Sequence, residues 1–264
     1  MNHLEIAQTM ARLAGELIKS KMGSGFITED KSSSFDVVTE VDKASELFIR
    51  NGILEQFPLH KFLGEEESFL NEKPLEEVLK GAAEEPYLWI VDPIDGTSNY
   101  VQGIPGFTVS IALACYGQLQ LGVIYDPCAD EMFWAEKGMG AFLNGRSIHV
   151  SPTNELGRSV VATGFPSNME ARRAVYEGLG RLIEKCRTIR SLGSAARHLA
   201  YVASGRLHAF WENGLNAWDI AAGVLIIQEA GGKVTDTKGN AYNLLTTNVV
   251  GSNGHLHEPV LHCL

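Results

Sequence analysis

The sequence has no long apolar run, few cysteines and a shortage of positive charge. No stretch of about 18 consecutive apolar residues occurs in it, so it predicts no membrane-spanning helix. Residues 1–21 carry charged and polar side chains throughout, unlike the apolar core of a signal peptide. The four cysteines are scattered and form no Cys-x-x-Cys pair. This usage predicts reduced thiols and a cytoplasmic protein.

Acidic residues outnumber basic ones. Lys and Arg total 22 against 32 for Asp and Glu, which gives a formal net charge of −10. Because such a protein repels the phosphate backbone at long range, we expect no nucleic-acid partner. An anionic substrate would meet the same repulsion. Its site would need a local source of positive charge, and bound divalent cations would supply it.

Several common catalytic motifs are missing as well. The sequence contains no G-x-x-x-x-G-K-[ST], no G-x-G-x-x-G and no H-E-x-x-H. The D-x-D-x-T string of haloacid dehalogenase phosphatases, whose first aspartate attacks phosphorus, also fails to match. The residue four positions before Thr97 is Pro93. The expected nucleophile is therefore a metal-activated water and not an aspartate.

The pattern of the chain changes near residue 152. Before it, apolar residues at helical spacing alternate with hairpin signals at 116–118 and at Asn144-Gly145. After it, short strands alternate with helices. We therefore expect two subdomains, an α+β half over residues 1–150 and an α/β half over residues 151–264.

Two of the expected helices come with specific predictions. One covers residues 41–57, and its inward face should carry the apolar side chains Ala44, Leu47, Phe48 and Leu54. The other runs to about residue 185, and a capping box from Ser167 to Glu170 should open it.

The string WIVDPIDGTSN, residues 89–99, is the best candidate for chemistry. A buried strand ends at Asp92, Pro93 forces a turn, and Asp95 adds a second carboxylate. Carboxylates at a strand end suit hard cations, which take oxygen ligands. The backbone amides of Gly96 and Thr97, at the start of a helical turn, suit a phosphate. A simple turn would need neither the second acid nor the threonine.

Further acids have alternative explanations. Glu65 and Glu66 follow Gly64 at a strand end, as Asp92 does, although runs of acids usually lie on a solvated surface. Asp219, in WDIAAG, could be a metal ligand, but a favourable interaction with the dipole at a helix start would explain an acid there equally well. Glu212, at the end of the strand in AFWENG, could equally be an exposed loop charge.

These pieces together resemble the inositol monophosphatase family. The strings GEE, WIVDPIDGTSNY, WDIAAG and EAGG occur in the family's order and at similar separations, and KSSSFDVVTEVD and GSAA extend the likeness over nearly the whole chain. The resemblance implies a layered αβαβα sandwich of the inositol monophosphatase and fructose-1,6-bisphosphatase type. It also implies a Mg²⁺-dependent, lithium-sensitive phosphatase that forms a homodimer.

The same resemblance implies roles for individual residues. Two or three Mg²⁺ ions would be held by oxygen ligands from Glu65, Asp92, Asp95, Asp219 and the backbone carbonyl of Ile94. Catalysis would use Asp42 and Thr97 to orient the attacking water, with support from Glu66. Substrate would be bound by Asp95, Gly96, Thr97, Ala195 and Glu212. Lys31 matches a family lysine near the metals, although a surface lysine is the simpler interpretation.

The implied reaction is hydrolysis of a small phosphate monoester. Inositol 1-phosphate is favoured, because an acid at the position of Glu212 accepts hydrogen bonds from inositol hydroxyls in the family. Fructose-1,6-bisphosphatase and histidinol-phosphatase activities share the metal site and stay open. A non-catalytic scaffold is disfavoured, because none of the metal-binding carboxylates is missing. The expected partners are a small phosphorylated polyol or sugar and a second copy of the chain, with no nucleic acid and no membrane.

Overall fold

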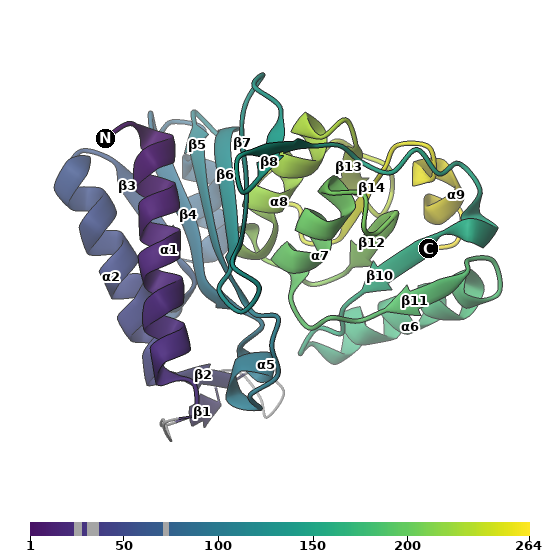
Figure 1. Ribbon diagram of the computed structural model, residues 1–264, viewed down its shortest axis with the longest axis horizontal. Helices are drawn as coiled ribbons and strands as arrows, with labels where there is room; N and C mark the ends of the chain where they lie inside the picture. Colours follow the sequence, from purple (N-terminus) through teal and green to yellow (C-terminus); the bar gives the residue numbers. More distant parts are fainter. Residues whose placement is uncertain (24–27, 31–36, 71–73) are drawn as a thin grey trace.

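The protein folds into five alternating layers of helices and sheets. The computed structural model describes residues 1–23, 28–30, 37–70 and 74–264. Figure 1 shows two helices on one side, then a seven-stranded sheet, two more helices, a five-stranded sheet and two outer helices. This is the αβαβα sandwich that the sequence predicted.

The first layer consists of α1 (His3–Lys21) and α2 (Glu40–Gln56), which pack against each other and against the first sheet. Asn2 caps α1 in a reciprocal capping box with Glu5. The face of α1 that includes Ile6, Ala7 and Met10 is buried, as the helical spacing of its apolar residues predicts.

The predicted inward face of α2 is wrong. Leu47 and Phe48 are 56% and 40% exposed, Ala44 is also exposed and Leu54 is half-buried. The buried face instead carries Val41, Asp42, Ser45, Glu46, Ile49 and Ile53. Apolar spacing misjudged the rotation of this helix because two carboxylates, Asp42 and Glu46, lie on its inner side and bind other segments of the chain.

The first sheet follows the chain in order. Its strands are β3 (Lys61–Gly64), β4 (Leu88–Asp95), β5 (Thr108–Cys115), β6 (Gln118–Asp126), β7 (Glu131–Glu136), β8 (Ala141–Leu143) and β9 (Arg146–Ile148). β3 and β4 are parallel, and every later pair is antiparallel. The predicted hairpins are confirmed: Gly117 and Gly145, together with the residue before each, have positive φ.

Short elements connect this sheet to the helices. They are the antiparallel pair β1 (Thr28–Asp30) and β2 (Val37–Thr39), and the helices α3 (Glu65–Leu70), α4 (Leu75–Gly81) and α5 (Thr97–Val101). α3 follows β3 and α5 follows β4 directly. Because β3 and β4 are parallel neighbours, both helices begin at the same edge of the sheet.

The second sheet has the order β11 (Thr188–Arg190), β10 (Val160–Thr163), β12 (Ala209–Glu212), β14 (Val249–Ser252) and β13 (Lys233–Asp236). β10 is parallel to both β11 and β12, and the remaining pairs are antiparallel. The short 3₁₀ turn Leu156–Arg158 leads into this sheet. α6 (Met169–Ile183) and α9 (His257–Leu261) lie on its outer side (Figure 1).

Between the sheets lie α7 (Ala195–Ala203) and α8 (Ala217–Glu229). Nearly all of α8 is buried, because one hydrophobic cluster joins its residues to both sheets. The first sheet ends at residue 148 and the second begins at residue 160. The division into subdomains 1–150 and 151–264 stays a prediction, since α8, which belongs to the second half of the chain, packs mainly on the first sheet.

The cap of α6 differs by one residue from the prediction. Asn168, and not Ser167, is the N-cap, and its side-chain oxygen accepts hydrogen bonds from the N–H groups of Glu170 and Ala171 at 2.9 and 3.0 Å. Asparagine ranks beside serine as a capping residue, so sequence alone could not separate the two neighbours.

Candidate metal centre and active site

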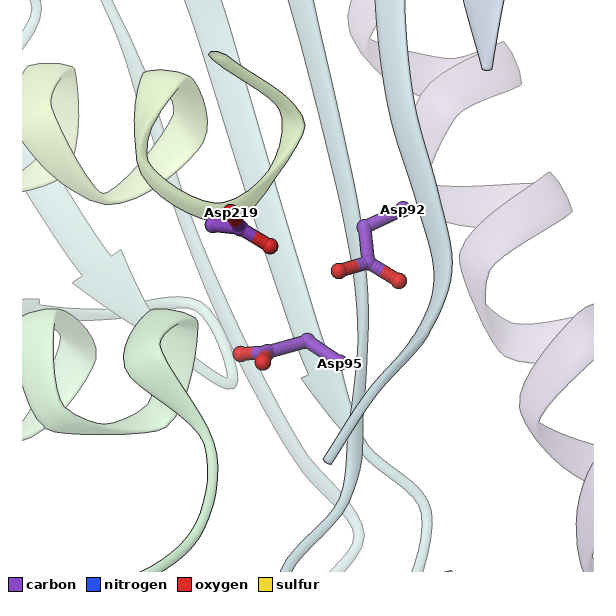
Figure 2. A group of neighbouring side chains, drawn as sticks. All are labelled: Asp92, Asp95 and Asp219. Carbon is purple, nitrogen blue, oxygen red and sulfur yellow. The ribbon is translucent and has the colours of Figure 1, made fainter. Parts of the chain in front are cut away.

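Three carboxylates from two distant segments meet between the sheets. Asp92 and Asp95 lie at the end of β4, and Asp219 lies in the first turn of α8. Each offers one oxygen, and these oxygens lie within 4.8 Å of one another. Figure 2 shows the three side chains pointing toward a common space. Asp92 and Asp95 are buried and Asp219 is half-buried.

An irregularity in the sheet brings the two β4 carboxylates together. The pairing of β4 with β5 shifts register between Asp92 and Asp95, and such a bulge redirects side chains that would otherwise alternate between faces. Asp92 Oδ1 accepts a hydrogen bond from the Ile94 N–H at 2.9 Å, which closes the turn around Pro93. The sequence D-P-I-D therefore places both acids toward α8.

Asp95 also anchors the beginning of α7. Its Oδ2 accepts hydrogen bonds from the Ser194 hydroxyl and the Ala196 N–H, both at 2.6 Å, and its Oδ1 accepts one from the Ala195 N–H at 3.2 Å. Burial raises the pKa of Asp95 to about 6, and these three hydrogen bonds act against the rise. The Ala195 amide, a predicted substrate contact, is thus already used by Asp95.

The geometry and charge of the group suit a hard divalent cation. Burial, followed by the charges of Asp95 and Glu65, raises the pKa of Asp219 well above its ordinary value. Ionised carboxylates this close together repel one another, which costs free energy. A cation bound among them would offset this repulsion. The donor atoms are all oxygens, which Mg²⁺ prefers. The residues therefore fit the metal that the sequence predicts.

Glu65 and Glu66 open α3, beside this group. Glu65 stands outside the set of carboxylates within 4.8 Å, yet its charge contributes to the raised pKa of both Asp95 and Asp219. Glu66 is buried, and its N–H is bound by Glu46. Glu65 therefore lies near the three aspartates but outside the group whose oxygens are within 4.8 Å of one another.

A threonine and an aspartate form a second pair next to the metal centre. Thr97 Oγ1 lies 3.1 Å from Asp42 Oδ1 and 3.0 Å from the carbonyl oxygen of Ile94. A hydroxyl has one proton, and the charged carboxylate is the stronger acceptor. Donation to Asp42 leaves the hydroxyl oxygen of Thr97 and the Ile94 carbonyl free to accept other groups.

The local sequence holds Asp42 in place. Thr39 and Asp42 form the capping box of α2, in which Asp42 Oδ2 accepts from the Thr39 N–H at 2.9 Å and Thr39 Oγ1 accepts from the Asp42 N–H at 3.3 Å. Asp42 is completely buried. One of its oxygens therefore fixes the helix, and the other faces Thr97.

Glu212 ends β12, near enough to Asp219 and Asp95 for their charges to affect its pKa. It is 6% exposed, and no hydrogen bond to its carboxylate is found within the described residues. Burial, with the charges of Asp219 and Asp95, raises its pKa well above the ordinary value. A Cβ on Gly164 would lie 2.0 Å from Glu212 Oε2, so a larger residue there would displace this carboxylate. The exposed-loop alternative for Glu212 is excluded.

Gly96 links the two halves of the site. Its φ is +99°, and a Cβ there would lie 2.9 Å from the carbonyl oxygen of Gly193. The nearby Asn99 Nδ2 donates to the Leu192 carbonyl at 2.8 Å. The turn that begins α5 is thereby fixed against the segment leading into α7, and its positive φ and close approach require glycine at position 96.

The sequence did not indicate three residues that support the site. Ser194 binds Asp95, Asn99 joins the two halves, and Glu46 binds the start of α3. A signal existed for Glu46, since it lies four residues after Asp42 and therefore on the same helical face. Lys31 lies outside the described residues.

An oxygen-lined centre for a divalent cation, between the two sheets of an αβαβα sandwich, defines the class of this protein. A model of the inositol monophosphatase family matches residues 2–263. The chain is 38% identical over 260 residues to Nus factor SuhB of Escherichia coli, across 98% of this chain and 94% of that protein. It is 37% identical over 261 residues to a fructose-1,6-bisphosphatase/inositol-1-monophosphatase of Thermotoga maritima, across 99% and 95%.

A solved structure gives the same result. The extragenic suppressor protein SuhB from Bartonella henselae matches with a TM-score of 0.89 and 36% identity, over 98% of this chain and 97% of that one. The chain therefore belongs to the inositol monophosphatase family, whose members are Mg²⁺-dependent phosphatases. In the described part of the chain, no helix combines the length and apolar character needed to cross a bilayer.

Proposed function

We propose that this protein hydrolyses inositol 1-phosphate to inositol and phosphate, with Mg²⁺ bound at the carboxylate centre. The observation that carries the proposal is the meeting of Asp92, Asp95 and Asp219 within 4.8 Å, beside the Thr97–Asp42 pair. Mg²⁺ bound by these acids, with Glu65 and the Ile94 carbonyl, would offset charge on the phosphoryl oxygens and lower the pKa of water.

The protein's own groups would align the reaction. The Thr97 hydroxyl donates a hydrogen bond to Asp42, which leaves its oxygen to accept a hydrogen bond from the attacking water and aim that water at phosphorus. As the water attacks, its proton can pass to Thr97 while the Thr97 proton passes to Asp42. The amides of Gly96 and Thr97, at the beginning of α5, would bind the phosphate. Glu66 would stabilise the segment that carries Glu65. Catalysis is then mostly positioning and electrostatics.

Glu212 supports a polyol as the leaving group. A buried carboxylate that accepts no hydrogen bond from the described residues costs free energy unless a ligand supplies donors. The vicinal hydroxyls of inositol are such donors, and a carboxylate accepts them strongly. Asp95 is already bound by Ser194, Ala195 and Ala196, so Glu212 is the better candidate for reading the sugar alcohol.

Fructose 1,6-bisphosphate is the second candidate. The relative from Thermotoga maritima is named for both activities, and a phosphorylated sugar offers similar hydroxyls to Glu212. The complete set of carboxylates favours either of these catalytic roles over a non-catalytic scaffold. We also propose, from the family resemblance, a homodimer and inhibition by lithium.

The test is phosphate release from four substrates, measured once with saturating Mg²⁺ and once with excess EDTA. The panel is inositol 1-phosphate, fructose 1,6-bisphosphate, histidinol phosphate and 3′-phosphoadenosine 5′-phosphate. We expect the highest kcat/KM for inositol 1-phosphate and no turnover in EDTA. Preference for another substrate would replace the inositol assignment, and full turnover in EDTA would refute the metal mechanism.

A further inference from the structure

One face of α2 carries three charged side chains, of which one contacts the beginning of α5 and two contact the beginning of α3. Asp42 accepts from Thr97, Glu46 accepts from the backbone at the start of α3, and Arg50 Nε lies 3.3 Å from Glu67 Oε2. Residues 42, 46 and 50 are spaced by four and therefore share one face. α2 is thus a single support for both motifs of the metal centre.

Glu46 makes the most buried of these contacts. Its Oε2 accepts a hydrogen bond from the Glu66 N–H and its Oε1 one from the Glu67 N–H, each at 2.7 Å. The first N–H groups of a helix have no partner within the helix, and here a carboxylate from another helix binds two of them. Glu46 is 4% exposed, so water cannot replace it at these amides.

The chain in front of α3 is shaped to admit this carboxylate. A Cβ on Gly64 would lie 2.3 Å from the Glu46 carboxyl carbon. Glu46 therefore packs against the backbone of the residue before Glu65 and binds the amides of the two residues after it. The Glu46 side chain therefore contacts the backbone on both sides of Glu65, although Glu46 precedes Glu66 by twenty residues in the sequence.

We propose that Glu46 is a positioning residue that fixes the direction of the Glu65 carboxylate and so sets the affinity of the centre for Mg²⁺. This inference rests on the proposed metal site. α3 spans only Glu65–Leu70, too short to hold its own first turn without outside support. When Glu46 is lost, the buried amides of Glu66 and Glu67 lack acceptors, and the segment carrying Glu65 must move to find new ones.

Two variants reach this contact from opposite sides. In Glu46→Gln, the amide can accept only one of the two hydrogen bonds and turns an NH₂ group toward the other donor. In Gly64→Ala, the new methyl group displaces the carboxylate. Arg50→Gln is the matched control: it removes another α2–α3 contact, but from a half-exposed ion pair with Glu67, which is worth little.

The measurement is Mg²⁺ binding by titration calorimetry without substrate, beside the Tm of the metal-free protein. We expect Glu46→Gln and Gly64→Ala to raise the Kd for Mg²⁺ about 10- to 100-fold, the usual effect of losing a group that orients a metal ligand. Arg50→Gln should change it by less than about twofold. A merely structural role would lower the Tm and leave the Kd unchanged.

The outcome separates this proposal from the proposed function. If Glu46→Gln or Gly64→Ala folds and binds Mg²⁺ as tightly as the wild-type protein, Glu46 does not position the ligand and the proposal is overturned. If the wild-type protein binds Mg²⁺ but hydrolyses no substrate of the panel, the proposed function fails while the binding comparison still decides the role of Glu46.

Discussion

Thr97 Oγ1 lies 3.1 Å from Asp42 Oδ1, although 55 residues separate the two in the sequence. The contact joins the capping box of α2 to the first residue of α5, next to the carboxylates of β4. An isolated threonine hydroxyl is a poor proton acceptor. Donating its proton to a buried carboxylate makes its oxygen a better one, so the pair can act as a single base.

The first prediction tests that unit. Thr97→Val and Asp42→Asn should each lower kcat by ~10²–10⁴, the usual effect of removing a positioned general base. Mg²⁺ and phosphate binding should change little. Because the two residues act together, the double variant should lose at most about threefold more than the worse single variant. Thr97→Ser keeps the hydroxyl and serves as the control. Independent, multiplicative losses would contradict a shared role.

The second prediction concerns the strain in the carboxylate group. Without a metal, Asp219→Asn should raise the Tm by about 2–4 °C at pH 7.5, because it removes a buried carboxyl whose ionisation is opposed by burial and by the neighbouring acids. Its amide oxygen can still accept the hydrogen bond from the Asn216 N–H. With saturating Mg²⁺ the order should reverse, since the wild-type protein gains binding energy that the variant has lost. Activity should vanish.

Differential scanning calorimetry of both proteins, in EDTA and in Mg²⁺, measures this reversal. A variant that is less stable than the wild-type protein under both conditions would show that the three carboxylates are not strained without metal. Glu177→Gln is a suitable control, because that glutamate is exposed on α6, outside the group of three aspartates.

The sequence predicted the two hairpins and the helices over residues 41–57 and up to about residue 185, because each depends on neighbouring residues. Turn residues such as Asn144 and Gly145, and the capping threonine of α2, carry their own local signals. It failed on the rotation of α2, where Leu47 and Phe48 face solvent and Glu46 faces inward. The apolar pattern cannot show a buried acid whose partners lie twenty residues away.

Long-range contacts also explain the missed residues of the site. Ser194 is the N-cap of α7, and its hydrogen bond to Asp95 depends on how α7 lies against β4. That arrangement follows from α8 filling the space between the sheets. Asp92 and Asp95 could be proposed as cation ligands from their local string. Glu65 and Asp219 could be proposed only because they occur in motifs that resemble a family.

The third prediction is a pH dependence of stability. His257 is fully buried, and its ring nitrogens lie 2.8 Å from the hydroxyls of Thr235 and Ser252. Burial, with the nearby charge of Lys233, lowers the pKa of His257 to about 4 from its ordinary value of 6.5. The folded ring thus stays neutral while the unfolded ring takes up a proton below pH 6.5. The contribution of the buried, neutral His257 ring to the free energy of unfolding is therefore complete above pH 6.5 and declines as the pH falls toward 4.

Urea unfolding of the wild-type protein and of His257→Gln tests this sign. The free energy of unfolding should differ most between them at pH 7.5, and the difference should shrink by about 2 kcal/mol at pH 5. Other titrating groups are common to both proteins and cancel. A difference that stays constant with pH would show that His257 has the same pKa in both states.

The last prediction separates chemistry from recognition of the substrate. Asp92→Asn should abolish turnover of every substrate, because an amide cannot supply the charge that holds a metal between β4 and α8. Glu212→Gln should instead weaken inositol 1-phosphate selectively, by roughly 1–3 kcal/mol for a lost charged hydrogen bond. An aryl phosphate has no hydroxyls to donate to Glu212 and should be nearly unaffected.

The readout is the ratio of kcat/KM for the two substrates, so a general loss of active protein cancels. The buried environment of Glu212 strengthens the expectation, since an amide there is easier to bury than a charge and should not unfold the site. If Glu212→Gln lowers both substrates equally, this carboxylate does not read the polyol, and inositol 1-phosphate loses its main structural support.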